Sequence, residues 1–163
     1  MRSAQPFLLC VLVVCCVAAS ACQKAVDLKT VLKVTDITTG WYDAGLVEDQ
    51  KNKLVPSISF RLTNNSDVNL KGIQINTVFR RVGEEDEWGS AYALPLRDGL
   101  APGKESDPIV LRSPLGYTGL QARNQMLQNR EFVDARVEVF GKYGSAGWVK
   151  LAESRIQRQL LTR

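Results

Sequence analysis

The chain has 163 residues, a formal net charge of +4 and no histidine. The lack of histidine excludes Ser-His-Asp and Cys-His catalysis as usually built, and every histidine-ligated zinc site. The basic residues are scattered, apart from a group at residues 155–163, whereas nucleic-acid binding needs clustered Lys and Arg. We therefore expect a binding protein without catalytic activity, cofactor, metal or nucleic-acid partner.

The N-terminus has the layout of a secretory signal peptide. Arg2 supplies a short basic start, residues 7–21 carry no charge, and small residues close the run at positions 18–21. A membrane-spanning helix needs about 20 apolar residues, and this run is shorter. The pattern predicts a signal peptide over residues 1–21 and a single domain over residues 22–163.

The end of this leader, Ala19-Ser20-Ala21-Cys22, resembles the lipobox of bacterial lipoproteins. The resemblance implies cleavage before Cys22 and a diacylglyceryl group on its sulfur. Ala19 departs from the family pattern, which most often has Leu at that place. An ordinary signal-peptidase site is the alternative, and it would leave Cys22 as an unmodified N-terminus.

The lipid would hold the protein on a membrane, since two or more acyl chains anchor stably. In the lipoprotein family, Asp after the cysteine favours the inner membrane. Here that residue is Gln23, which favours the outer membrane. We expect a location in the cell envelope, lipid-anchored through Cys22 and facing the periplasm.

Cysteine usage agrees with this interpretation. Cys10, Cys15 and Cys16 lie within the leader and would be lost with it, which leaves Cys22 alone. The mature chain would then have no internal disulfide, although an oxidising compartment would permit one.

The rest of the chain reads as short strands separated by turn residues. Alternating apolar residues predict strands, and an antiparallel pair is expected from residues 55–64 and 68–81 around an Asn-rich turn. Residues 120–130 are rich in helix-forming residues and predict one short helix. The other strands expected, in chain order, span residues 24–39 (with helix as an alternative), 90–96, 107–112, 133–141 and 148–161.

Three aromatic residues stand in predicted turns. Trp41 and Tyr42 lie in a turn expected over residues 39–45, which is followed by a charged loop at residues 48–53. Trp88 lies near the end of an acidic run over residues 83–89, which is typical of a solvated hairpin tip. The run lacks the ligand spacing of a calcium loop. These aromatics either cap the core or form a partner-binding surface, because aromatics are enriched in both settings.

Together the strands and turns predict an all-β fold, a two-sheet antiparallel immunoglobulin-like sandwich. Residues 54–79 resemble bacterial extracytoplasmic immunoglobulin-like or fibronectin-III-like domains. Residues 100–111, LAPGKESDPIVL, resemble a turn and strand common in such domains, including the FxLyD type. The resemblance implies a fold class and leaves activity open.

We expect a lipid-anchored accessory protein that contacts another envelope protein, with Trp41, Tyr42 and Trp88 as candidate contact residues. The alternative is a carrier of a small apolar ligand between the two sheets.

Overall fold

The structure is a computed structural model that describes residues 26–161; the predicted signal peptide and Cys22 lie outside this range. Short helices and turns separate the strands. The elements in chain order are α1 (Leu28–Val31), β1 (Leu32–Val47), the 3-10 turn η1 (Glu48–Gln50), β2 (Lys51–Asn64), β3 (Gln74–Arg81), β4 (Gly89–Ala93), β5 (Ile109–Arg112), β6 (Tyr117–Gly119), α2 (Arg123–Gln128), β7 (Ala135–Lys142), β8 (Val149–Arg155) and β9 (Leu160–Leu161).

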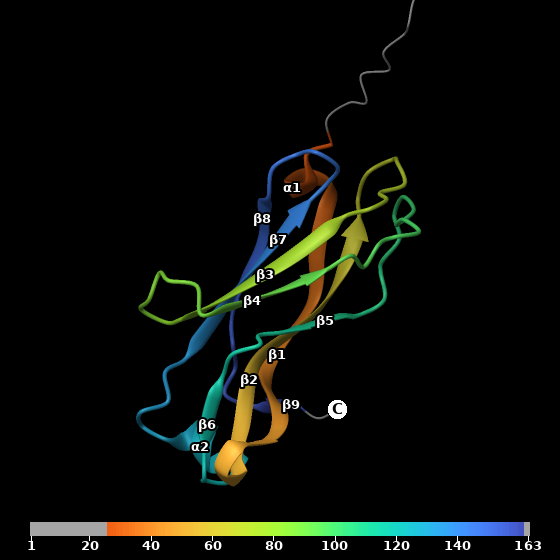
Figure 1. Cartoon of the computed structure of the whole chain (residues 1–163). Coiled ribbons are helices and arrows are strands. Elements are labelled where there is room, and N and C mark those ends of the chain that lie inside the picture. Colours follow the sequence, from red (N-terminus) through yellow and green to blue (C-terminus); the bar gives the residue numbers. More distant parts are fainter. Residues whose placement is uncertain (1–25, 162–163) are drawn as a thin grey trace, which may run out of the picture.

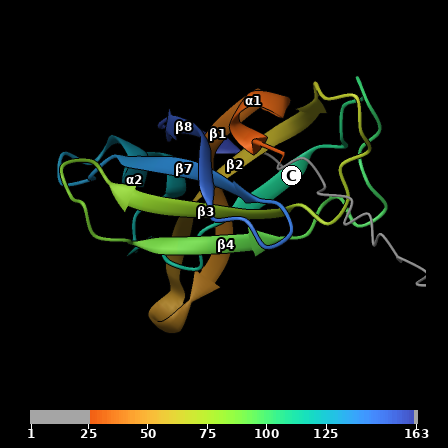
Figure 2. The ribbon, with the colours of Figure 1, turned by 90° about the horizontal axis from the view of Figure 1, so that it is seen from above.

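The strands form two sheets that pack face to face (Figures 1 and 2). One sheet has the order β5-β2-β1-β9, with β6 also paired to β2, and the other has the order β4-β3-β7-β8. Pairing is antiparallel except between β1 and β9, which run parallel. The predicted all-β two-sheet sandwich is confirmed, and the short helix predicted at residues 120–130 is α2.

The predicted turn at residues 39–45 is wrong, because β1 continues through it to Val47. The chain reverses at η1 instead, and Trp41 and Tyr42 pair with Pro56 and Val55 of β2. Gly45, with φ of 88°, sits in an irregularity of the β1–β2 ladder. This glycine therefore marks a bulge within a strand, where a positive φ is needed, and not a reversal of the chain.

The predicted pairing of residues 55–64 with residues 68–81 is also wrong, since β2 and β3 belong to different sheets. Each strand points its apolar side chains into the same core from opposite sides. Alternation shows which side chains face inward, but it does not identify the neighbouring strand. The buried Asn64 side chain stabilises the connection that passes from one sheet to the other, because its Nδ2 donates to the carbonyls of Val68 and Leu100 at 2.8 and 2.7 Å.

Both ends of the domain differ in detail from the prediction. Residues 28–31, expected in a strand, form α1, where the Asp27 side chain accepts a hydrogen bond from the Lys29 amide at 3.0 Å. The strand predicted at residues 148–161 is split at the buried Ile156, so that β8 joins one sheet and β9 the other.

The space between the sheets is filled by large side chains with no exposed surface. Burial of such side chains is the main source of stability in a domain of this size. Fully buried members from both sheets are Trp41, Leu54, Ile58, Phe60, Leu62, Ile75, Phe79 and Val137.

Gly116 precedes β6 and lies against the backbone of β2. A Cβ atom at this position would overlap the Leu54 carbonyl oxygen. We expect Gly116→Ala to lower the free energy of unfolding by about 1–3 kcal/mol, the usual cost of overpacking, because β6 has to shift away from β2. Chemical denaturation measures this loss. Gly147→Ala is the control, since nothing lies within 4 Å of its Cβ position, and equal effects of the two substitutions would contradict the prediction.

Candidate binding surfaces

Four aromatic rings form a layer at one end of the sandwich. Trp41 of β1 is fully buried, and its ring centroid lies 4.6 Å from that of Phe132, 5.7 Å from Tyr117 and 6.2 Å from Trp88. Tyr117 also lies 4.7 Å from Phe132 and 5.0 Å from Trp88. We call these four residues the aromatic layer. It joins β1, the β3–β4 loop, β6 and the α2–β7 connection.

Arg81 fastens the acidic loop to this layer. Its guanidinium lies 5.0 Å from the Trp88 ring centroid and forms a 3.5 Å ion pair with Glu84. The carboxylates of residues 84–87 remain at the exposed tip, while Trp88 turns inward and is half-buried. Cation–π contacts of this kind are worth about 0.5–2 kcal/mol, so Trp88 and Arg81 together hold the base of the loop against the aromatic layer.

The three predicted contact residues do not form one surface. Trp41 has no exposed area, so it is not available to a partner in this conformation, and it caps the core. Trp88 packs beside it. Tyr42 points to the opposite face of its sheet, since neighbouring strand residues alternate, and there it stacks on Arg112 with the guanidinium 3.5 Å from its ring centroid.

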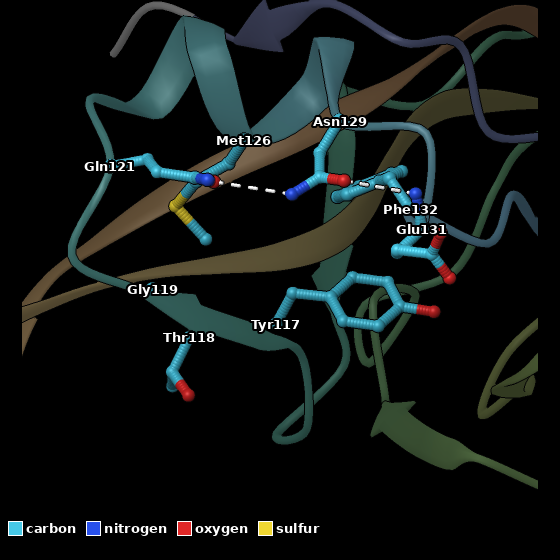
Figure 3. Close-up of a pocket in the computed structure, with 8 residues that line it drawn as sticks. All are labelled: Tyr117, Thr118, Gly119, Gln121, Met126, Asn129, Glu131 and Phe132. Atoms are coloured by element: carbon cyan, nitrogen blue, oxygen red, sulfur yellow. Dashed lines mark hydrogen bonds between the residues drawn. The ribbon is translucent and has the colours of Figure 1, made fainter.

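A pocket of about 180 Å³ opens beside the aromatic layer, beneath α2 (Figure 3). Rings and a thioether meet amides and a carboxylate in its wall. Its lining residues are Tyr117, Thr118, Gly119, Gln121, Met126, Asn129, Glu131 and Phe132. Asn129 orders the wall, because its Nδ2 donates to Gln121 and its Oδ1 accepts from the Glu131 amide, at 3.4 and 2.9 Å.

The Tyr117 hydroxyl donates to the Val133 carbonyl at 3.2 Å. Burial raises the pKa of this hydroxyl above its ordinary value, and the nearby Arg81 charge offsets only part of the effect. Tyr117 is therefore a neutral phenol at physiological pH. The ring contributes an apolar wall to the pocket, and its hydroxyl is already committed to the backbone.

Two exposed leucines lie at the same end of the molecule as the pocket. Leu120, between two lining residues, is 74% exposed, and Leu46 near the end of β1 is 57% exposed. Leu46 pairs with Asn52 of β2, which in turn pairs with Gly119 of β6, so the two leucines lie two strands apart at the same end. We call Leu46, Leu120, Glu131 and the pocket the distal surface.

Few features of the sequence predict this surface. Leu120 follows a glycine in a loop and belongs to no alternating run, so no period marks it as either buried or exposed. The only sequence feature that marks it is a leucine outside any apolar alternation, at the start of the helix predicted over residues 120–130. The pocket itself depends on the approach of β6 to α2, which the sequence does not show.

A second surface lies on the outer face of the other sheet. Tyr92 of β4 is 54% exposed and Trp148, just before β8, is 44% exposed. Their rings meet edge to face with centroids 6.4 Å apart. Ala91 and Ala93, on either side of Tyr92, pack against the core, which places Tyr92 on the solvent side. We call Tyr92 and Trp148 the aromatic pair.

A network of charged side chains covers the remainder of that outer face. Glu138 of β7 is only 8% exposed and is held by Arg80 at 3.0 Å and by Lys150 at 3.2 Å. Arg136 lies 3.7 Å from Glu138 and extends the network to Glu85 of the acidic loop at 3.2 Å. Burial alone would raise the pKa of Glu138, but the hydrogen bonds from Arg80 and Lys150 outweigh it, and the pKa is lowered.

Two further observations concern metals and membranes. Among residues 26–161, no group of three or more Cys, Asp or Glu side chains is arranged to hold a metal ion. Within the same residues, no helix is long and apolar enough to cross a bilayer.

Comparison with protein-family models finds no match, and comparison with curated proteins finds none either. Among solved structures, the chain aligns with the ligand-binding region of Serine-glutamate repeat protein A (SgrA) of Enterococcus faecium. That alignment has a TM-score of 0.29 and 15% sequence identity, and it covers 71% of this chain and 89% of that chain. At this TM-score the likeness carries no argument, so function is argued from the residues themselves.

The charged network generates a pH-dependent prediction. Because the pKa of Glu138 is lowered in the folded state, its contribution is present above the unfolded-state pKa and is lost as pH falls through the folded-state pKa. We expect Glu138→Gln to cost about 1.5–3 kcal/mol at pH 7, as for a hydrogen bond to a charged group. The difference from wild type should shrink in acid.

Urea denaturation at several pH values measures both effects. Glu87→Gln, in the exposed acidic loop, is the control and should leave stability nearly unchanged. A cost for Glu138→Gln that stays constant down to the lowest pH would contradict the assignment.

Proposed function

We propose that this protein is a lipid-anchored accessory protein of the bacterial cell envelope that contacts another envelope protein and has no catalytic activity of its own. Three features of the sequence support this proposal: the predicted signal peptide, the lipobox-like residues that end at Cys22, and the absence of histidine. Gln23 after the cysteine favours the outer membrane, with the domain facing the periplasm.

The observation that carries a binding role is the distal surface. Figure 1 shows α1, which follows the proposed anchor, at one end of the molecule and η1, β6 and α2 at the other. A lipid on Cys22 would therefore leave the distal surface furthest from the bilayer. Exposed leucines beside a pocket are typical of the apolar centre of a protein interface.

The chemistry of this surface indicates the kind of partner. A pocket of about 180 Å³ is smaller than the roughly 300 Å³ at which drug-sized ligand sites begin, so it suits a single side chain. The Glu131 carboxylate at its rim forms no hydrogen bond or ion pair with the described residues, and it would complement a cation. The partner we propose presents an apolar anchor residue flanked by Lys or Arg.

The centre of the sandwich does not favour the carrier alternative. A ligand between the sheets would occupy space now filled by side chains such as Phe60 and Phe79, which have no exposed surface.

Site-specific photo-cross-linking in the native host tests the distal surface. A photoreactive residue at position 120 should give one discrete adduct with an envelope protein, because this side chain is 74% exposed. The matched control is position 110 on β5, where Val110 is 50% exposed on the outer face of the sheet. Glu131→Lys should weaken the adduct at position 120 by charge repulsion. Equal adducts at both positions, or none at 120, would contradict the proposal.

The anchor is tested separately by fractionation. Cys22→Ala removes the sulfur that would carry the lipid, so we expect the variant to leave the membrane fraction and the mature wild type to show an added lipid mass. Mass spectrometry of the mature protein and membrane fractionation check this. Unchanged membrane attachment in the variant would mean that the leader is not a lipoprotein signal.

A further inference from the structure

The aromatic pair lies towards the end of the molecule that carries α1. The β7–β8 connection, which leads to Trp148, lies at the same end of the molecule as α1 (Figure 1). Leu28 of α1 packs next to Gly141 near the end of β7, which fixes this arrangement. The start of the described chain and the loop that ends at Trp148 therefore lie at the same end of the domain, where the end of β7 contacts α1.

The proposed anchor limits how far this end of the domain can lie from the membrane. Four peptide units separate Cys22 from Val26, and a fully extended chain spans about 3.3–3.6 Å per residue. Val26 can therefore lie no further than about 14 Å from Cys22. A lipid inserted at Cys22 thus keeps α1 and its neighbours close to the headgroups.

The side chains exposed here suit a lipid surface. Tyr and Trp concentrate at membrane–water interfaces, because their rings are apolar at one end and polar at the other. Lys29 of α1 and Lys142 at the end of β7 form no side-chain hydrogen bond or ion pair with the described residues. Asp27 lies just before α1, and its carboxylate is used to cap the N-terminus of that helix. Long lysine side chains reach headgroups from such positions.

We infer that the aromatic pair, with Lys142 beside it, contacts the headgroup region of the bilayer that holds Cys22. This inference rests on the lipid anchor of the proposed function. It adds an orientation: the outer face of the β4-β3-β7-β8 sheet lies against the membrane, and the distal surface points away from the membrane.

Tryptophan fluorescence can test this contact directly. The chain has three tryptophans, of which Trp41 is fully buried and Trp88 lies in the aromatic layer at the other end. The mature lipidated protein is reconstituted into vesicles of phosphatidylethanolamine and phosphatidylglycerol, with and without lipids brominated near the headgroup. Bromine quenches only a ring that approaches it closely.

We expect bromine-dependent quenching in the wild type and its loss in Trp148→Phe, with Trp88→Phe as the matched control that retains it. Absence of quenching in a protein shown by mass to be lipidated would overturn the inference and leave the anchor intact, and the aromatic pair would then be free for a protein partner. An unlipidated mature protein would overturn both. Quenching that survives in Trp148→Phe would also contradict the inference.

Discussion

The packing of Trp41 against Phe132, Tyr117 and Trp88 is the interaction on which the proposed binding end depends. These rings come from segments that no hairpin connects, so their burial determines how β6, the acidic loop and the α2–β7 connection approach β1. The indole Nε1 of Trp41 is buried without a hydrogen-bond partner among the described residues. Such a group costs about 1–3 kcal/mol, which the burial of four aromatic rings must exceed. The pocket exists because Tyr117 and Phe132 each belong both to this layer and to its wall.

The domain thus has two ends with different chemistry. Near α1, an exposed aromatic pair accompanies Lys29 and Lys142, whereas the other end presents leucines, a small pocket and the Glu131 carboxylate. The charged network around Glu138 lies between them and ties the acidic loop to the sheet through Glu85. A protein held by its N-terminus can use this division, because one end stays near the bilayer while the other reaches a partner. Both roles are proposals that the arrangement of side chains supports.

The sequence predicts the structure correctly where a local pattern of residues determines it. The alternation of Ile58, Phe60 and Leu62 correctly assigned the buried face of β2, and the helix formers after Gln121 marked α2. Predictions from the sequence were wrong where the structure depends on contacts between residues far apart in the chain. Gly45 marked a bulge and not a turn, and the Asn64 turn carries the chain from one sheet to the other. Trp41, Tyr42 and Trp88 were predicted as candidate contact residues, but Trp41 and Trp88 pack with Tyr117 and Phe132, and Tyr42 lies on the opposite face of its sheet against Arg112. Tyr92, Trp148 and Leu120 had no pattern that separated exposed from buried, so the surfaces proposed here required the structure.

In the orientation we propose, the two ends of the lipidated protein stand at different distances from the membrane. Spin labels at positions 120 and 146, one in the distal surface and one in the β7–β8 connection, would measure this in reconstituted vesicles by their accessibility to oxygen and to a water-soluble relaxant. We expect the label at position 146 to behave as a headgroup-level site and the label at position 120 as a fully aqueous one. Equal aqueous accessibility at both positions would contradict it.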